Sequence, residues 1–260
     1  MKKTRWALVL GGSKGLGFAT VRKLGENGYS ILAVHRDRKT DLTVLDKNFK
    51  SLRAGGVVVH NFNADALNNQ SRNELIAQIE KIIPAGEKIS VLVHSIAKGH
   101  LKPMLAGKGD PLEGADLQLT VNAMAISLYD WTKLLHEHEL FSSDTRIIAF
   151  TSEGNTKALP YYAAVSAAKC ALEAIVRSIA LEFAPLGIKA NCIQAGVTDT
   201  ESFRRIPRSE KIKKVAIQRN PNGRLTRPED VANAVYLLCL EEANWITGTV
   251  IKVDGGESLL

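Results

Sequence analysis

The segment Trp6-Ala-Leu-Val-Leu-Gly-Gly-Ser-Lys-Gly-Leu-Gly17 gives the strongest indication of the fold of this chain. Its first half belongs to an apolar run, Arg5–Leu10, that has the length of a short buried strand. Its second half, Gly11–Gly17, is a glycine-rich loop that opens a helix over Gly15–Gly28. Glycines let the backbone approach a pyrophosphate, and the free N–H groups of a helix N-terminus favour an anion. The stretch therefore predicts a dinucleotide-binding unit, with a plain turn before a helix as the alternative.

The same alternation of apolar runs and helical periodicity continues to the end of the chain. Further strands are expected at Ser30–His35, Val57–Phe62, Ile89–His94, Thr145–Thr151, Ile188–Ile193 and Thr249–Val253. Helices are expected at Leu117–His136, Tyr161–Ala184 and Pro228–Leu240. This order predicts an α/β fold: a single-domain Rossmann fold over residues 1–260, with a doubly wound, parallel, seven-stranded sheet and helices on both faces. Ligands of such sheets bind beyond the carboxyl ends of the strands.

The composition and the lengths of the apolar segments indicate which class of protein this chain belongs to. Of 260 residues, 45% are hydrophobic and 23% charged, which is typical of a soluble globular domain. No stretch has the length of a membrane-spanning helix, and the run before Gly11 is too short for a signal-peptide core. The three cysteines are far apart and no cluster has metal-ligand spacing, so we expect neither a disulfide nor a metal. These patterns predict a cytoplasmic protein without a membrane or nucleic-acid partner.

The net charge of +7 is concentrated in residues 201–227, which hold nine basic and two acidic residues. The other 233 residues are therefore neutral on balance. The basic residues are Arg204, Arg205, Arg208, Lys211, Lys213, Lys214, Arg219, Arg224 and Arg227. A local basic segment favours an acidic partner. A solvated amphipathic helix is the alternative.

The end of the second expected strand, Val34-His35-Arg36-Asp37-Arg38, bears on the choice of cofactor. Arg36, with Lys14 across the loop, could pair with a 2′-phosphate, which favours NADPH. Asp37 keeps NADH possible, and a solvated basic turn is the alternative. Asp65, after the third strand, could accept a hydrogen bond from the adenine amino group or could form an N-cap or turn.

Tyr162 precedes Lys169 by seven residues in the helical run Tyr161–Ala184. Seven residues are two helical turns and leave the side chains about 20° apart. A phenol and an ammonium on one face can stabilise developing negative charge on a substrate oxygen. Tyr161 lies about 80° from Lys169 and is the poorer candidate. The alternative is that Tyr162 only packs, but a buried unpaired lysine in this apolar stretch is costly, which favours a cofactor partner for Lys169.

These residues resemble the short-chain dehydrogenase/reductase family over essentially the whole chain. The resemblance rests on the glycine loop, Asn122, the Tyr/Lys helix and the closing Val253-Asp254-Gly255-Gly256. Within the family the chain is most similar to bacterial enoyl-acyl-carrier-protein reductases, because it has Val93-His94-Ser95-Ile96-Ala97 and their Tyr-x6-Lys spacing. The glycine loop and the final Asp-Gly-Gly-Glu-Ser-Leu-Leu resemble the NADPH-using branch of those enzymes.

The resemblance implies hydride transfer from NADPH to C3 of a trans-2-enoyl thioester on acyl carrier protein, in fatty-acid elongation. It implies that Tyr162 holds the enolate oxygen, and that Lys169 binds the nicotinamide ribose. The Val197 amide and carbonyl would hold the carboxamide and Thr198 the pyrophosphate. Phe203 and Ile206 would contact the acyl chain from a mobile lid over residues 200–219, in a homotetramer paired through the long helices. The implied cofactor contacts are Gly11, Ser13, Lys14, Gly15, Leu16, Gly17, Arg36, Asp65, Ala66, Ser95, Ile96, Ala97, Lys169, Val197 and Thr198.

Two departures keep other readings open. In the family's ketone/alcohol dehydrogenases a serine is followed thirteen residues later by a tyrosine, and four residues after that by a lysine. Ser152 and Lys169 fit this spacing, but Val165 occupies the position of its tyrosine. A second tyrosine, ten residues before the catalytic one in many enoyl reductases, falls on Ser152. A reductase of another carbonyl or enone, including 3-oxoacyl thioesters, is therefore one alternative. A non-catalytic NADP-binding regulator is another, against which the presence of both Tyr162 and Lys169 argues.

Overall fold

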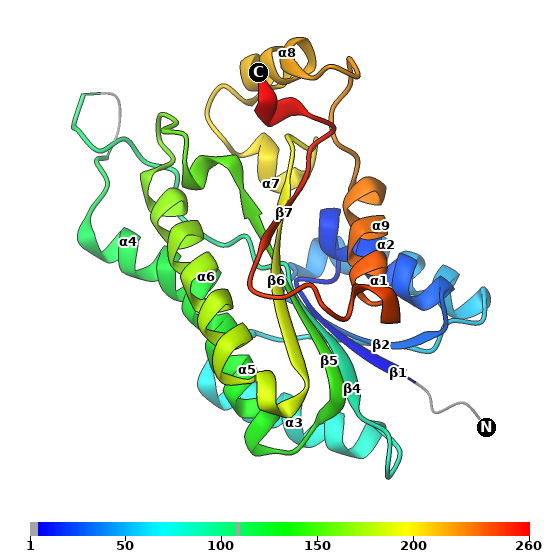
Figure 1. Cartoon of the computed structure of the whole chain (residues 1–260). Helices are drawn as coiled ribbons and strands as arrows, with labels where there is room; N and C mark the ends of the chain where they lie inside the picture. Colours follow the sequence, from blue (N-terminus) through cyan, green and yellow to red (C-terminus); the bar gives the residue numbers. More distant parts are fainter. Residues whose placement is uncertain (1–4, 108–109) are drawn as a thin grey trace.

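One seven-stranded parallel sheet runs through the computed structural model, which describes residues 5–107 and 110–260. The order of strands across it is β3-β2-β1-β4-β5-β6-β7 (Figure 1). The strands are β1 (Arg5–Leu10), β2 (Tyr29–His35), β3 (Val59–Asn63), β4 (Ile89–His94), β5 (Phe141–Ser152), β6 (Ile188–Ala195) and β7 (Val250–Val253). The predicted α/β, doubly wound architecture is confirmed. Of the predicted domain, residues 1–4 and 108–109 lie outside the described residues.

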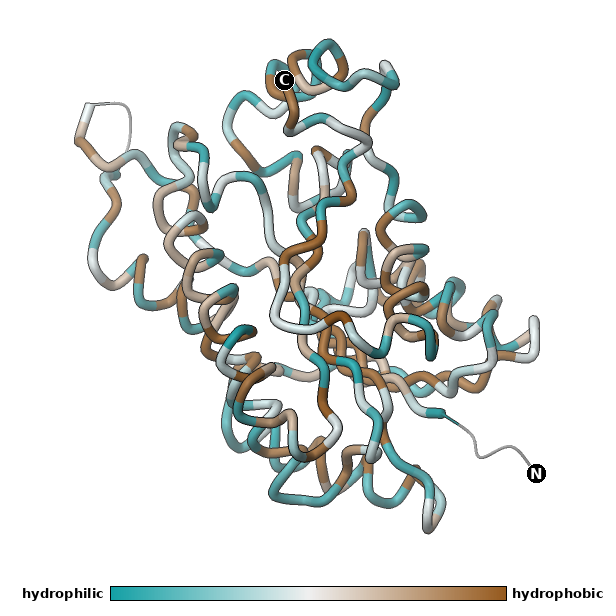
Figure 2. Tube along the Cα trace, viewed as in Figure 1, coloured by the Kyte–Doolittle hydropathy of each residue, from teal (hydrophilic) through white to brown (hydrophobic). Residues whose placement is uncertain are grey.

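Helices cover both faces of the sheet, because the central strands bury side chains on both sides. Figure 2 shows hydrophobic stretches along the strands at the centre of the molecule. One face packs on α3 (Asn69–Ile82), α5 (Ser127–Glu137) and α6 (Ala163–Glu182). The other packs on α1 (Gly15–Glu26), α2 (Lys39–Ala54) and α9 (Pro228–Leu238). The remaining α-helices are α4 (Gly114–Val121), α7 (Glu201–Arg204) and α8 (Ser209–Arg219). Among the described residues, no helix is long and apolar enough to cross a membrane.

Two of the expected helices differ from the observed ones in ways that affect the site. The predicted helix Leu117–His136 is divided into α4, a π-helical turn at Asn122–Ile126 and α5. Hydroxyls of Thr120, Ser127 and Thr132 donate to carbonyls four residues back, a pattern that bends helices. The predicted helix Tyr161–Ala184 begins only at Ala163, and Tyr162 is its N-cap residue.

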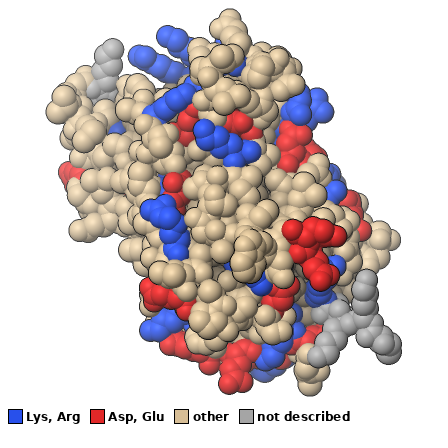
Figure 3. Space-filling model, viewed as in Figure 1, with Lys and Arg blue, Asp and Glu red and all other residues tan. Residues whose placement is uncertain are grey.

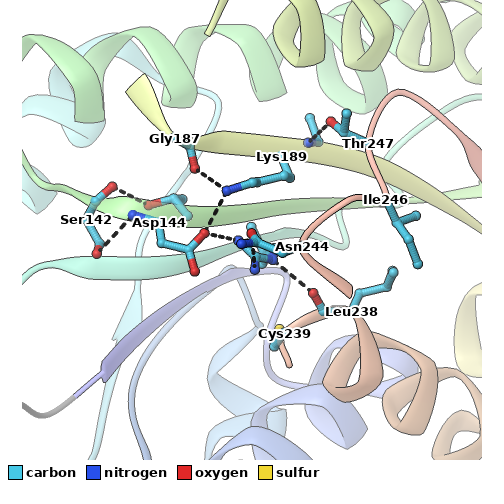
Figure 4. Close-up of polar contacts among 12 residues, drawn as sticks. Ser142, Asp144, Gly187, Lys189, Leu238, Cys239, Asn244, Ile246 and Thr247 are labelled. Carbon is cyan, nitrogen blue, oxygen red and sulfur yellow. Dashed lines mark hydrogen bonds and ion pairs between the residues drawn. The ribbon is translucent and has the colours of Figure 1, made fainter. Parts of the chain in front are cut away.

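A buried arginine ties the amino ends of the strands to the end of α9 and the segment after it. Figure 4 shows its neighbours Asp144, Lys189 and Asn244. Arg146 of β5 donates from Nε to the Leu238 carbonyl over 3.1 Å and from Nη2 to Asn244 Oδ1 over 3.0 Å. Asp144 pairs with Arg146 and accepts from Lys189 Nζ over 2.9 Å. These contacts leave the opposite, carboxyl end of the sheet free, where α7, α8 and the C-terminus lie together (Figure 1).

Candidate active site

The glycine loop sits at the carboxyl end of β1 with its backbone tightly packed. The N–H groups of Gly11 and Gly12 both donate to the Val34 carbonyl, over 2.8 and 3.1 Å. A Cβ on Gly11, whose φ is +85°, would lie 2.5 Å from the Ser95 carbonyl oxygen. A Cβ on Gly17 would lie 2.1 Å from the Gly11 carbonyl oxygen. The loop therefore needs glycine at both positions, and it brings Ser95 of the Ser95–Ala97 segment against it.

The helix that follows the loop suits an anion. Within the described residues, α1 starts at Gly15 with no side-chain cap and no acidic residue in its first turn. Ser13 is buried at the turn. Backbone N–H groups at such an N-terminus, in the segment Gly15–Gly17, bind phosphate through hydrogen bonds and the helix dipole. The residues present therefore fit a dinucleotide pyrophosphate.

Acidic side chains surround Lys14, beside the loop. Its Nζ lies 3.1 Å from Asp37 Oδ1, 2.7 Å from Asp41 Oδ2 and 3.0 Å from Glu201 Oε2. The sequence did not indicate this cluster, because Glu201 is far along the chain from Asp37 and Asp41. A 2′-phosphate would have to displace them from Lys14. The Arg36 side chain is 62% exposed, so it is the freer of the two cations expected to bind that phosphate.

Asp65 and Ala66 lie where the adenine is expected but already have partners. Asp65 Oδ1 accepts from the Leu67 N–H over 3.0 Å, which is the turn that the sequence left open. Asp65 Oδ2 lies 2.8 Å from Arg36 Nη1. The Ala66 carbonyl accepts from the Trp131 indole over 2.9 Å. Contacts of Asp65 and Ala66 with adenine stay predictions.

Tyr162 reaches Ser152 at the carboxyl end of β5. The two hydroxyl oxygens are 3.2 Å apart. Tyr161, immediately before, has a φ of +67°, an uncommon conformation for a bulky residue that redirects the chain into α6. Gly154 makes room for the ring, because a Cβ there would lie 2.4 Å from Tyr162 Cε1. Local strain and a required glycine thus place the phenol against Ser152.

The burial of Tyr162 and Lys169 sets their protonation. Burial raises the pKa of the Tyr162 phenol, and the Ser152 hydroxyl offsets part of this rise. The phenol therefore stays protonated at neutral pH and can donate a hydrogen bond. Lys169 Nζ donates to the Phe150 carbonyl over 2.7 Å. Burial lowers the pKa of Lys169 to about 8, with Cys192 and Glu173 opposing the change.

Val165 occupies the position where the ketone/alcohol spacing would place a tyrosine. It is 5% exposed and packs with Met124 and Ala168, against partly buried Leu101 and Tyr162. This cluster makes one wall of the site apolar. Asn122, which the resemblance includes, is exposed at the start of the π-helical turn.

His94 is fully buried at the end of β4. Its Nε2 lies 2.8 Å from Ser127 Oγ, and that hydroxyl donates to the Ala123 carbonyl over 2.8 Å. The His94 Nε2 therefore carries the proton in this pair. Burial, and then the charge of Lys169, lower the pKa of His94 to about 3. The imidazole stays neutral and acts as a support for the π-helical turn.

The loop after β6 is joined to the C-terminal turn. The Val197 N–H donates to Glu257 Oε2 over 3.0 Å, and Thr198 Oγ1 donates to the Gly196 carbonyl over 2.9 Å. Arg219 Nη2 bridges Glu257 Oε1 at 3.0 Å and Glu153 Oε2 at 2.5 Å. The sequence did not indicate Glu153 and Glu257 as site residues. No local pattern points to Glu257, because its contact with Val197 joins residues 60 positions apart.

The segment expected to be a lid forms α7 and α8 over the carboxyl ends of the strands. Phe203 is buried and Ile206 half-buried, so both have apolar contact area. Basic side chains gather around this end of the molecule (Figure 3). Arg204 and Lys213 pair with Asp199, and Arg205 pairs with Glu201. Of the basic residues on α8 and its N-cap, Arg208, Lys211 and Lys214 form no ion pair within the described part of the chain. The described residues also contain no group of metal-ligating side chains.

Comparisons with known proteins identify the family of this chain. The family model described as "Enoyl-(Acyl carrier protein) reductase" matches residues 11–258. The (2S)-[(R)-hydroxy(phenyl)methyl]succinyl-CoA dehydrogenase subunit BbsD of Thauera aromatica is 28% identical over 261 residues, covering 99% of this chain and 98% of its own. A tropinone reductase homolog of Arabidopsis thaliana is 29% identical over 254 residues, covering 98% of this chain and 91% of its own.

A solved structure of an enoyl-[acyl-carrier-protein] reductase (NADH) from Aquifex aeolicus VF5 shares the fold. Its TM-score is 0.84 at 24% identity, with 99% of this chain and 98% of that one covered. The family model spans the glycine loop, the Tyr162–Lys169 helix and the closing Asp-Gly-Gly segment. The chain therefore belongs to the short-chain dehydrogenase/reductase family of oxidoreductases.

Proposed function

We propose that this protein is an NADPH-dependent enoyl-acyl-carrier-protein reductase of fatty-acid elongation. One observation carries the proposal: the phenol that meets Ser152 comes from Tyr162, seven residues before Lys169, while Val165 is buried in an apolar cluster. A donor displaced in this way suits an enoyl thioester, whose carbonyl lies two carbons from the atom that receives the hydride.

The reduction needs a donor for the oxygen that becomes negative. NADPH, when bound, supplies the hydride to C3 of the enoyl thioester. The protonated Tyr162 hydroxyl donates to the thioester oxygen, which takes enolate character, and removal of comparable donors costs roughly 3–4 kcal/mol. Lys169 adds positive charge nearby and binds the ribose hydroxyls. The apolar wall of Val165, Met124 and Leu101 limits water at the reacting carbons.

The choice of NADPH rests on Arg36. Its exposed guanidinium can leave Asp65 for a 2′-phosphate, and an arginine fork suits phosphate geometry. Lys14 supports the phosphate less than its sequence position indicates, because three carboxylates already hold it. Titration with NADPH and NADH, for wild type and Arg36→Ala, tests this assignment.

The basic side chains of Arg208, Lys211 and Lys214 favour an acidic carrier protein as the molecule to which the substrate is attached. Arg208, Lys211 and Lys214 are at the N-cap and on the exposed side of α8, beside the segment that holds Phe203 and Ile206. Charge reversal at Lys211 and Lys214 should raise KM for the carrier-bound substrate and leave KM for a coenzyme A thioester unchanged.

The proposed assembly is a homotetramer paired through α4, α5 and α6. Sedimentation in solution tests this assembly, and a monomer would contradict it.

A second candidate is reduction of a 3-oxoacyl thioester or another ketone, which the Ser152–Tyr162 hydroxyl pair favours. Two hydroxyls 3.2 Å apart can hold one carbonyl oxygen, whichever bond is reduced. NADPH oxidation with crotonyl and acetoacetyl thioesters, run beside NADH, separates the two candidates. Turnover with the acetoacetyl thioester alone would reject the enoyl assignment.

A further inference from the structure

A buried carboxylate from the C-terminal turn lies inside the candidate site. Glu257 is 2% exposed, and its two oxygens accept from the Val197 N–H and from Arg219, each over 3.0 Å. Burial raises the pKa of Glu257, the Val197 N–H and Arg219 oppose this rise, and Glu153 adds to it. A buried charge is costly unless it is paired. Both contacts are therefore needed to keep this carboxylate where it is.

The same contacts lead to the reacting groups. Arg219, the last residue of α8, also pairs with Glu153 over 2.5 Å. Glu153 directly follows Ser152, whose hydroxyl meets Tyr162. Figure 1 shows the C-terminal segment beside α8, above the carboxyl ends of the strands. Val197 is thus linked to the Ser152–Tyr162 pair through three charged side chains.

The other end of the Val197 loop meets the phosphate loop. Thr200 Cγ2 lies 3.3 Å from where a Cβ of Gly15 would be, and Glu201 pairs with Lys14. A dinucleotide with its pyrophosphate at the N-terminus of α1 and its reactive ring near Tyr162 would pass residues 197–200, because Thr200 lies beside Gly15. Its carboxamide oxygen is an acceptor for a backbone N–H in that segment, as the carboxylate of Glu257 is now.

We propose that Glu257 takes, in the free protein, the Val197 N–H that the nicotinamide carboxamide takes in the complex. The C-terminal turn thus competes with the reactive end of the cofactor. This rests on the proposed function for the identity of the ligand. On displacement, Glu257 keeps Arg219 as its partner, so the carboxylate is not left unpaired. The competition weakens binding of the whole dinucleotide but not of its adenosine half.

Calorimetric titration of the full-length protein tests this with two ligands, NADP⁺ and 2′-phospho-ADP-ribose, which lacks the nicotinamide. Glu257→Ala should bind NADP⁺ about tenfold more tightly, since a charge-assisted hydrogen bond no longer competes. Its affinity for 2′-phospho-ADP-ribose should not change. Glu257→Gln should fall between, because an amide oxygen still accepts from Val197. NAD⁺ and ADP-ribose form a parallel pair for an NADH-preferring protein.

Glu153→Gln is the matched control, because it loses the other ion pair of Arg219 and leaves Val197 bound to Glu257. Its ratio of NADP⁺ to 2′-phospho-ADP-ribose affinity should equal that of wild type. Equal changes for both ligands in Glu257→Ala, or no change, would overturn the competition and indicate a purely structural carboxylate. If Glu257→Ala fails to fold in thermal unfolding, the near-isosteric Glu257→Gln decides. Wild type that binds neither dinucleotide overturns the proposed function itself.

Discussion

Replacing Lys169 with methionine should make the free protein more stable while removing its activity. Burial lowers the pKa of Lys169 from 10.5 to about 8. At 1.36 kcal/mol for each pKa unit, the charged lysine costs about 3 kcal/mol at pH 7. Methionine keeps the apolar stem but leaves the Phe150 carbonyl without this donor, at a cost of about 1 kcal/mol. The expected net gain is about 2 kcal/mol, or roughly 4–8 °C in Tm.

The pH dependence of this gain in stability shows whether it comes from the charge of Lys169. Below the folded pKa of about 8 the full penalty is present, because both states are protonated. It declines as pH rises from about 8 to the unfolded value of 10.5, where both states are neutral. The stability difference between Lys169→Met and wild type should therefore shrink by about 2 kcal/mol from pH 7 to pH 9.5. Urea unfolding at the two pH values measures it.

An exposed lysine provides the control for the Lys169→Met experiment. Lys47 is exposed on α2, so Lys47→Met should differ from wild type by the same small amount at both pH values. A Lys169→Met variant that is less stable than wild type, by an amount independent of pH, would contradict a desolvation penalty at Lys169. It would mean that Lys169 is held as a cation by contacts stronger than its desolvation.

Three further changes test the site. Tyr162→Phe should lower kcat by about 10²- to 10³-fold in steady-state assays with Tm nearly unchanged, since only the bond to Ser152 is lost; wild-type turnover would contradict its role as donor. Gly17→Ala should abolish NADPH binding by calorimetry and lower Tm, because its Cβ would meet the Gly11 carbonyl oxygen at 2.1 Å, whereas Gly114→Ala, with open space around it, should do neither. Arg36→Ala should raise the KM for NADPH about tenfold or more and leave that for NADH unchanged, so that equal effects on both would remove Arg36 from 2′-phosphate recognition.

Much of the fold could be predicted because its signals are local. The strand Arg5–Leu10 and the loop Gly11–Gly17 are adjacent in the chain, and Gly17 is required by its contact with the nearby Gly11. Gly11 is required by a distant residue, Ser95, which follows β4. The strand–helix alternation fixed a parallel sheet, and the right-handed crossovers between parallel strands restrict its topology. The spacing of Tyr162 and Lys169 likewise favours Tyr162 over Val165 as the donor, and this role stays a prediction.

The environment of those residues depended on tertiary structure. Lys14 meets the distant Glu201 as well as Asp37 and Asp41, and Glu257 meets Val197 from 60 positions away. The π-helical turn of Asn122–Ile126 and the N-cap position of Tyr162 also escaped the helical periodicity. The local patterns of the sequence specified the parallel sheet and the glycine loop, because each depends on residues that lie close together in the chain. The pairing of Tyr162 with Lys169 at a reacting centre stays a prediction. Which charges surround Lys14 and Val197 depends on the tertiary fold, because the carboxyl ends of all the strands meet at one edge and bring distant loops into contact there.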